Sequence, residues 1–311
     1  MKRVLTIVLH AANDAALWVD AFRGAFPESR IEPWSETAAS EADYAVVWKP
    51  PSGLMRGLRR AKAVFNLGAG VDSITDLDEI PSGIPLVRLD DAGMAEQMVE
   101  YVCHAVLRRY RELDAYAEQQ RGGIWQARPR KAKRDFAIGL LGAGVLGAAV
   151  AEELVRLGFS VRVWSRTRKQ IAGVDSFAGD RELDRFLSAA HFLVCLLPRT
   201  RETESLLDRA RLSRLPRGAY VVNVARGGLI VDSDLLALLD EGHLSGAMLD
   251  VFREEPLPQG HPFWRHPGIA LTPHVSAATL VQPSVDQIAD KIRRLEARLP
   301  ITGIVDRDRG Y

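Results

Sequence analysis

The chain has very little cysteine. Cys103 and Cys195 are the two thiols among its 311 residues, and they stand far apart in apolar contexts. This excludes a small scaffold held together by disulfide bonds. No Cys/His spacing suggests a zinc site, so we expect two reduced, buried thiols and no metal.

Net charge and long apolar runs are also missing. The 41 Lys and Arg residues nearly balance the 40 Asp and Glu residues, so no overall field attracts nucleic acid or a membrane surface. No apolar run approaches the ~20 residues of a membrane span. The N-terminal stretch MKRVLTIVLHAAND has too short an apolar core for a signal peptide. We therefore expect a cytoplasmic protein that binds neither nucleic acid nor membrane.

What is present is a regular alternation of short apolar runs and helical patterns. The stretches VLTIVL, YAVVW, AVFNLG and PLVRL read as strands, and DAALWVDAFRGAF between the first two has helical spacing. A second series opens with FAIGLLGAGVLG and continues with FSVRVW, HFLVCLL, AYVVNVA, GAMLDVF and IALTPH. Alternating strands and helices predict an α/β fold with parallel sheets.

A long helix and a connector separate the two series. The stretch GMAEQMVEYVCHAVLRRYRELDAYAEQQ predicts one long helix, and RGGIWQARPRKAKRD then interrupts it. The last helix, near VDQIADKIRRLEARL, is expected to return to the first domain. The predicted domains are residues 1–100 plus 277–311, and residues 101–276. The apolar face of the long helix contains Met94, Met98, Val102, Ala105 and Val106.

The glycine-rich stretch GAGVLG lies between a predicted strand and a predicted helix. Gly142 permits a tight turn, Gly144 lets the backbone approach a pyrophosphate, and Gly147 lets helix and strand pack closely. The phosphate would lie at the helix N-terminus, at Val145 and Leu146, where free N–H groups point. The spacing predicts a Rossmann-like dinucleotide-binding domain, and a turn that only packs is the weaker alternative.

The next strand ends without the acidic residue that would bind the ribose hydroxyls of NAD. The stretch VWSRTRK has Ser165, Arg166 and Thr167 there instead. A guanidinium group forms bidentate, charge-assisted hydrogen bonds with a phosphate. We therefore expect NADPH as the cofactor, with NADH weaker, and Arg168 or Lys169 adding charge at longer range. A solvated basic loop is the alternative.

Three further polar residues follow predicted strands. Arg226 follows VVNVA, Glu255 lies in LDVFREEP, and His274 lies in LTPH. Open α/β sheets place their ligands at the carboxyl ends of the strands, where these residues are expected. Each residue alone is unremarkable.

Taken together, the chain resembles the D-isomer-specific 2-hydroxyacid dehydrogenases, and within them the glyoxylate/hydroxypyruvate reductase A group. The resemblance covers nearly the whole chain. It implies two Rossmann-like α/β domains with parallel sheets flanking an active-site cleft. It also implies a homodimer formed by the long helix and the arm from Trp125 to Arg134. The motifs that carry it are LGAGVDS, GMAEQM, LGAGVLG, WSRTRK, FAG, NVARG, GAMLDVF, EPLP, TPHV and VDRDRGY.

The resemblance implies NADPH-dependent reduction of a small 2-keto acid to a 2-hydroxy acid: glyoxylate to glycolate, or hydroxypyruvate to glycerate. His274 would be the general acid, and Glu255 would hold its other ring nitrogen. Arg226 would bind the substrate carboxylate and polarise the carbonyl group. Glu255 is preferred to its neighbour Glu254 because Pro256 follows it.

Other site residues are expected as well. The backbone N–H groups of Ala69 and Gly70 would bind the second carboxylate oxygen, as the resemblance implies. Trp48, beside Lys49, either lines the cleft or packs under the loop. Trp264 is expected to anchor the loop that carries Glu255 in the core. The remaining expected cofactor contacts are Leu197, Pro198, Ala225 and Asp250.

Two alternatives remain open at this point. Non-enzymatic, dinucleotide-sensing corepressors share this fold and this set of three residues. A reductase of another 2-keto acid would also fit the motifs. Turnover of glyoxylate with NADPH separates the sensor from the enzyme.

Overall fold

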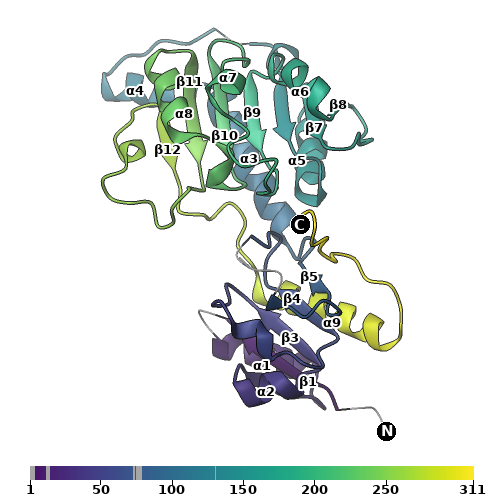
Figure 1. Ribbon diagram of the computed structural model, residues 1–311. Helices are drawn as coiled ribbons and strands as arrows, with labels where there is room; N and C mark the ends of the chain where they lie inside the picture. Colours follow the sequence, from purple (N-terminus) through teal and green to yellow (C-terminus); the bar gives the residue numbers. More distant parts are fainter. Residues whose placement is uncertain (1–3, 12–14, 73, 75–78, 130) are drawn as a thin grey trace. The chain divides into compact units, whose positions relative to one another are not determined.

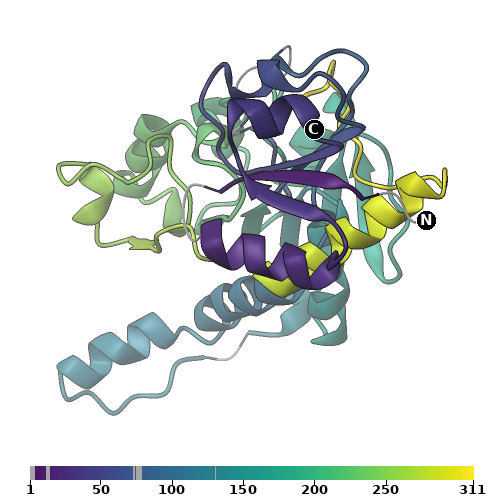
Figure 2. The ribbon, with the colours of Figure 1, turned by 90° about the horizontal axis from the view of Figure 1, so that it is seen from below.

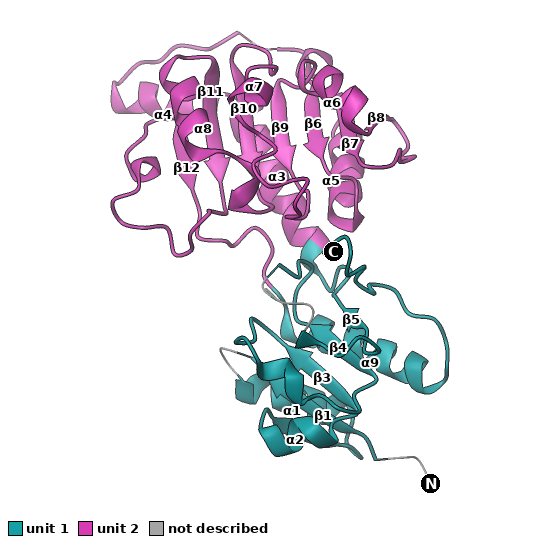
Figure 3. Ribbon diagram, viewed as in Figure 1, with its two compact units in different colours: residues 1–94, 279–311 teal, residues 95–278 magenta. Residues whose placement is uncertain are grey.

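The computed structural model describes residues 4–11, 15–72, 74, 79–129 and 131–311 (Figure 1). The chain forms two compact units (Figure 3). Unit 1 comprises Met1–Met94 and Thr279–Tyr311, and unit 2 comprises Ala95–Ala278. Each unit has a parallel sheet covered by helices, which confirms the predicted α/β class.

Unit 1 has a five-stranded sheet in the order β2-β1-β3-β4-β5, with every pairing parallel. All residues of β3 and β4 are buried, as expected for central strands covered on both faces. The sequence predictions missed β2. The strands are β1 (Thr6–His10), β2 (Arg30–Pro33), β3 (Tyr44–Val47), β4 (Ala63–Asn66) and β5 (Leu86–Val87), and the helices are α1 (Ala15–Ala25), α2 (Glu36–Glu41) and α9 (Val281–Glu296).

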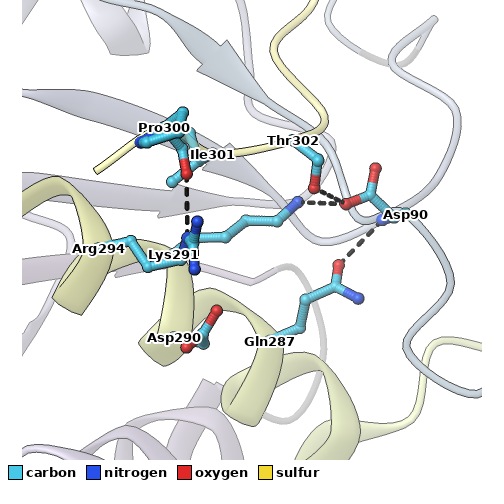
Figure 4. A pocket seen from close by; sticks show the side chains of 8 residues that line it. All are labelled: Asp90, Gln287, Asp290, Lys291, Arg294, Pro300, Ile301 and Thr302. Carbon is cyan, nitrogen blue, oxygen red and sulfur yellow. Dashed lines mark hydrogen bonds and ion pairs between the residues drawn. The ribbon is translucent and has the colours of Figure 1, made fainter.

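The last helix, α9, packs against α1 and belongs to unit 1. Its Lys291 is almost fully buried, and the ammonium group lies 2.8 Å from Asp90 and donates to the carbonyl of Arg88 at 3.0 Å. The Thr302 hydroxyl donates to the same Asp90 carboxylate at 2.6 Å (Figure 4). These contacts join α9, the segment after β5 and the C-terminal segment beside a hollow of about 260 Å³.

Unit 2 has a seven-stranded parallel sheet in the order β12-β11-β10-β9-β6-β7-β8. Its strands are β6 (Ile138–Leu141), β7 (Val161–Ser165), β8 (Val174–Ala178), β9 (Phe192–Cys195), β10 (Ala219–Asn223), β11 (Leu244–Leu249) and β12 (Ile269–Leu271). Its helices are α3 (Met94–Tyr110), α4 (Leu113–Arg121), α5 (Val145–Arg156), α6 (Asp180–Leu187), α7 (Arg209–Leu212) and α8 (Asp232–Asp240).

The two faces of this sheet have separate apolar clusters. Phe192 and Val194 of β9 pack with residues of α3 and α5, whereas Leu193 and Cys195 pack with residues of α6, α7 and α8. This alternation follows from the period of two along a strand. Cys195 is a free, buried thiol, and burial raises its pKa to about 12. Cys103 is free but only half-buried, and burial raises its pKa to about 11.

The long helix predicted from residue 93 to residue 120 is in fact two helices. Helix α3 ends at Tyr110, Glu112 adopts a left-handed backbone with φ of 54°, and α4 begins at Leu113. The Glu112 carboxylate accepts from Arg128 Nε of the connector at 2.6 Å. The break therefore coincides with a contact to the connector that the local helical pattern does not include.

Helix α4 has no buried residue, and it extends away from the sheet of its own unit together with the connector (Figure 2). By contrast, the predicted apolar face of α3 is confirmed, since Met98, Val102, Ala105 and Val106 are buried. No helix in the described part of the chain combines the length and the apolar character that a membrane span requires.

Candidate active site

The glycine-rich turn connects β6 to α5. Strand β6 lies between β9 and β7: strands β7 and β8 follow on one side of it, and strands β9 to β12 follow on the other side. Open α/β sheets bind their ligands at such a switch in strand order. Gly142 has φ of +116°, and a Cβ atom there would lie 2.7 Å from the Leu196 carbonyl oxygen. A Cβ atom on Gly147 would lie 2.1 Å from the Gly142 carbonyl oxygen, whereas Gly144 faces open space.

Helix α5 begins at Val145, directly after this turn. No side chain caps its N-terminus, and its first turn contains no acidic residue. Val145 is 47 % exposed and Leu146 is partly buried. The first N–H groups of a helix have no partner inside the helix. The turn therefore offers uncapped donors beside open space at Gly144, which fits a phosphate group.

The VWSRTRK stretch follows β7, where the adenosine ribose of a dinucleotide would lie. Ser165 is buried, and its hydroxyl donates to the Thr167 carbonyl at 2.8 Å, so it shapes the loop. Arg166 and Thr167 are exposed. Arg168 donates to both Glu182 oxygens, at 2.8 and 2.7 Å, so its charge is neutralised within the protein. The local sequence around Arg168 did not reveal this pairing, because Glu182 lies on another element, helix α6.

Arg226 stands in the loop after β10. The buried Asn223 shapes this loop: its Nδ2 donates to the Arg226 carbonyl at 2.9 Å, and its Oδ1 accepts from the Ala225 N–H at 3.1 Å. Arg226 Nη1 donates to the Ala225 carbonyl at 2.6 Å. A Cβ atom on Gly227 would lie 1.9 Å from the Phe252 carbonyl carbon. The Arg226 loop is therefore in direct backbone contact with the segment that carries Glu255.

Glu255 and His274 form the central pair of the site. His274 Nδ1 lies 2.7 Å from Glu255 Oε2, and the Phe252 N–H donates to Glu255 Oε1 at 3.0 Å. Burial acts to raise the pKa of Glu255, but hydrogen bonds from His274 and Phe252 and the charges of His274 and Arg226 outweigh it. The pKa of Glu255 is therefore below its ordinary value, and the carboxylate is ionised at neutral pH.

The segment after β12 holds His274 in a left-handed backbone conformation with φ of 56°. The His274 N–H donates to the Asp250 carbonyl at 2.8 Å. The fully buried Asp250 carboxylate accepts from the Val275 N–H at 2.8 Å, the Ser276 N–H at 2.9 Å and the Thr272 hydroxyl at 2.6 Å. Asp250 therefore fixes the loop, and a direct contact with a cofactor remains a prediction.

Three other expected cofactor contacts lie at the same edge of the sheet. Leu197 and Pro198 follow β9, and Ala225 follows β10. Leu197 and Ala225 are buried in the apolar cluster of this edge, whereas Pro198 is exposed and its carbonyl accepts from the Thr203 hydroxyl at 2.7 Å. A direct contact of these three residues with a cofactor remains a prediction.

Trp48, Ala69 and Gly70 belong to unit 1. The Trp48 ring packs against the Ala69 loop, because a Cβ atom on Gly68 would lie 2.5 Å from Trp48 Cζ3. Asn66 Nδ2 donates to the carbonyls of Gly68 and Gly70, at 3.2 and 2.9 Å. Within the described residues, the N–H groups of Ala69 and Gly70 donate to no acceptor of the chain. The start of the predicted following helix lies partly outside the described residues.

One expectation at the edge of the site is wrong. Trp264 is not a core anchor: it is 54 % exposed, and its Nε1 donates to the Pro258 carbonyl at 2.9 Å. The neighbouring Phe263 occupies the core instead, with 3 % exposure. Both residues lie in the short 3₁₀ turn Pro262–Trp264, where adjacent side chains point in different directions.

Sequence reasoning also missed Arg253. Its Nε and Nη2 donate to the Ile230 carbonyl at 3.0 and 2.6 Å, and its Nη1 donates to Glu204 at 3.1 Å. Arg253 thus ties the segment of Glu255 to the loop after Arg226. Its position beside two acidic residues gave no signal of this role.

Comparison with known proteins identifies the family of this chain. Residues 103–276 match the NAD-binding domain of the D-isomer specific 2-hydroxyacid dehydrogenases. The chain is 46 % identical over 310 residues to a glyoxylate/hydroxypyruvate reductase A of Salmonella newport, covering 98 % of this chain and 99 % of that protein. The chain belongs to the D-isomer specific 2-hydroxyacid dehydrogenase family. Membership of this dehydrogenase family makes the protein an oxidoreductase.

Solved structures of family members have the same fold. A Xanthobacter autotrophicus member in complex with NADPH and MES has a TM-score of 0.94 at 39 % identity, covering 99 % of this chain and 100 % of that one. An NADPH-dependent glyoxylate/hydroxypyruvate reductase of Sinorhizobium meliloti, in complex with NADP and sulfate, has a TM-score of 0.90 at 35 % identity. That match covers 98 % of this chain and 100 % of that one.

Proposed function

We propose that this family member is an NADPH-dependent reductase of small 2-keto acids, converting glyoxylate to glycolate and hydroxypyruvate to glycerate. The observation that carries the proposal is the 2.7 Å contact between His274 Nδ1 and Glu255 Oε2, beside Arg226, at the sheet edge that bears the glycine turn. The relatives named as glyoxylate/hydroxypyruvate reductases support the same chemistry.

The proposed reaction needs a hydride at the carbonyl carbon and a proton at the carbonyl oxygen. Bound NADPH supplies the hydride. His274 donates the proton from Nε2 while Nδ1 stays bonded to Glu255, whose ionised carboxylate stabilises the imidazolium. Arg226 binds the substrate carboxylate and polarises the carbonyl group through charge-assisted hydrogen bonds.

The second carboxylate oxygen of the substrate is assigned to the N–H groups of Ala69 and Gly70. Their lack of an acceptor within the described residues supports this assignment, because buried or half-buried N–H groups normally find a partner. Trp48 contributes apolar surface beside this loop, since its ring packs on Gly68 and remains half exposed.

The cofactor assignment rests on two features of unit 2. The uncapped start of α5 and the open space at Gly144 fit the pyrophosphate. The exposed Arg166 and Thr167 after β7 fit the 2′-phosphate that distinguishes NADPH from NADH. We therefore assign cofactor binding to residues 101–276, and substrate binding to residues 1–100 with 277–311.

We further propose that the protein is a homodimer, with α3, α4 and the arm from Trp125 to Arg134 in the contact. Helix α4 buries none of its residues within the chain. Exposed apolar side chains on α4 and the segment after it favour an interface, and a two-fold dimer would bury them on both copies. The apolar side chains concerned include Leu113, Tyr116, Ile124 and the fully exposed Trp125.

Initial rates with a panel of 2-keto acids and both cofactors test the proposal. We expect turnover of glyoxylate and hydroxypyruvate, with kcat/KM higher for NADPH than for NADH. A higher rate with a different keto acid would reassign the substrate. Absence of turnover with every keto acid, together with tight NADPH binding, would contradict the enzymatic role.

A further inference from the structure

The short segment that carries His274 is held at both ends by side chains of α3. At one end, Tyr101 and Thr272 are joined by a hydrogen bond of 2.5 Å between their hydroxyl groups. At the other end, Gln97 Nε2 donates to the Ala278 carbonyl and Gln97 Oε1 accepts from the Ala278 N–H, both at 3.0 Å. The segment between these two anchors contains the left-handed backbone of His274.

The direction of the hydrogen bonds can be assigned from the donors available. The Thr272 hydroxyl has one hydrogen atom, and Asp250 Oδ1 accepts it at 2.6 Å. The Tyr101 hydroxyl must therefore donate to Thr272. Burial raises the pKa of Tyr101 to about 12, so the phenol keeps its proton at neutral pH and can act as this donor. A single chain of hydrogen bonds thus runs from Tyr101 through Thr272 to Asp250.

This chain ends on the groups that set the backbone at His274. Asp250 Oδ1 also accepts from the Val275 N–H, and the Asp250 carbonyl accepts from the His274 N–H. A non-glycine residue keeps a left-handed backbone when its surroundings over-determine that conformation. Loss of the Tyr101 bond would leave Thr272 and Asp250 free to rearrange beneath His274.

The α3 helix is suited to hold the segment. Gln97 and Tyr101 are four residues apart, so they lie on one face of the helix, one turn from each other. Met98 and Val102, next to them in sequence, are buried in the apolar cluster beneath the sheet. The two anchors therefore project from a helix that is itself fixed in the core.

We propose that Gln97 and Tyr101 are positioning residues that clamp the Thr272–Ala278 segment to α3 and so align the His274 ring with Glu255. The inference rests on the proposed function for the role of His274 as the proton donor. Neither side chain touches the reacting atoms in this assignment. They affect the reaction only because they set the position of the His274 ring, which is the proton donor.

The experiment compares Tyr101→Phe with Tyr110→Phe. Tyr110 lies on the same helix, and its hydroxyl donates to the Lys131 carbonyl at 2.7 Å, away from the His274 segment. Because small displacements of catalytic groups cost up to about 100-fold, we expect Tyr101→Phe to lower kcat by about 10- to 100-fold. The Kd for NADPH, measured by nucleotide fluorescence, and the KM for glyoxylate should change less than about two-fold. The contacts that bind the cofactor and the substrate are assigned to other residues, so ground-state binding should stay the same.

A second pair of variants tests the same chain at Thr272. Thr272→Ser keeps the hydroxyl group and should retain wild-type kcat, whereas Thr272→Val should lose kcat as Tyr101→Phe does. The kcat of the double variant Tyr101→Phe/Thr272→Val should be no lower than that of Thr272→Val, because both changes break the same chain of hydrogen bonds. If Thr272→Val does not fold, Tyr101→Phe and Thr272→Ser still decide the question.

Two outcomes would overturn the proposal. One is a kcat for Tyr101→Phe equal to that of Tyr110→Phe. Another is a loss in which kcat and NADPH affinity fall together, which would indicate general destabilisation. His274→Ala, measured alongside, separates the two proposals: if it retains turnover, the assignment of the proton donor fails, whatever Tyr101→Phe does.

Discussion

His274 Nδ1 lies 2.7 Å from Glu255 Oε2, while the other oxygen of that carboxylate accepts from the Phe252 N–H at 3.0 Å. Both carboxylate oxygens are therefore occupied by donors, and the depressed pKa of Glu255 keeps the group ionised. An ionised carboxylate only accepts, so Nδ1 must carry a hydrogen atom. The geometry thus leaves Nε2 as the nitrogen that can exchange a proton with a substrate.

His274→Ala should lower kcat by about 10²- to 10⁴-fold, which is the usual contribution of a general acid. The Kd for NADPH should stay within about two-fold, since the cofactor contacts are assigned elsewhere. Steady-state rates with glyoxylate and a fluorescence titration with NADPH measure the two effects. His266→Ala is the matched control, because His266 also faces a carboxylate, Asp240 at 3.4 Å, away from the site. Near wild-type turnover of His274→Ala would show that another group donates the proton.

Glu255→Gln should move the alkaline limb of the pH–kcat/KM profile for reduction to lower pH. The sign follows from charge: the neutral amide stabilises the imidazolium less than the carboxylate does, so the acid loses its proton at lower pH. Activity at low pH should be less affected than activity at pH 8. Glu254→Gln, an exposed neighbour, should leave the profile in place. A profile of Glu255→Gln that coincides with the wild type would remove Glu255 from the proton-donor pair.

Arg166→Ala should lower kcat/KM for NADPH by about 10- to 100-fold, since a hydrogen bond to a charged group contributes about 1.5–3 kcal/mol. NADH lacks the 2′-phosphate, so its kcat/KM should hardly change. The preference should also weaken as ionic strength rises. Lys169→Ala in the same loop provides the comparison and should have a smaller effect. Equal losses for both cofactors would mean that the loop only packs.

Trp125→Ser should shift the protein from dimer to monomer in sedimentation velocity at micromolar concentration. Truncation of a large aromatic side chain at an interface removes one of its strongest anchors. Leu17→Ser is the control, because Leu17 is 56 % exposed but lies on α1. A wild-type protein that sediments as a monomer would contradict the dimer, and an unchanged dimer in Trp125→Ser would exclude this arm from the contact.

Local sequence patterns were sufficient for most of the strands and for the nucleotide turn. Central strands such as β9 and β10 are buried at every position and mostly apolar, and Gly142, Gly144 and Gly147 have the spacing that the turn requires. In contrast, β2 (Arg30–Pro33) and β8 (Val174–Ala178) contain exposed or half-exposed polar residues, because they are edge strands. Their sequences therefore lacked the signal on which the prediction relied.

The features that the sequence did not reveal depend on partners far away in the chain. The break at Glu112 involves Arg128, and the charge of Arg168 is neutralised by Glu182. Similarly, Tyr101 reaches Thr272 across 171 positions. Local patterns carry no information about such pairs. The motif residues Arg226, Glu255 and His274 were recognisable because each follows a strand, but their hydrogen bonds were not.

The left-handed backbone at residue 274 affects how a saturation library at this position should be interpreted. Most L-residues resist a φ of 56°, and β-branched residues resist it most, whereas Asn, Asp and His accept it more readily. Inactive Val or Ile variants would thus combine a missing acid with a strained loop. Asn keeps the backbone and can still donate to Glu255, but it cannot transfer the proton. His274→Asn is therefore the substitution that separates chemistry from conformation, and it is suited to capturing a stalled substrate complex.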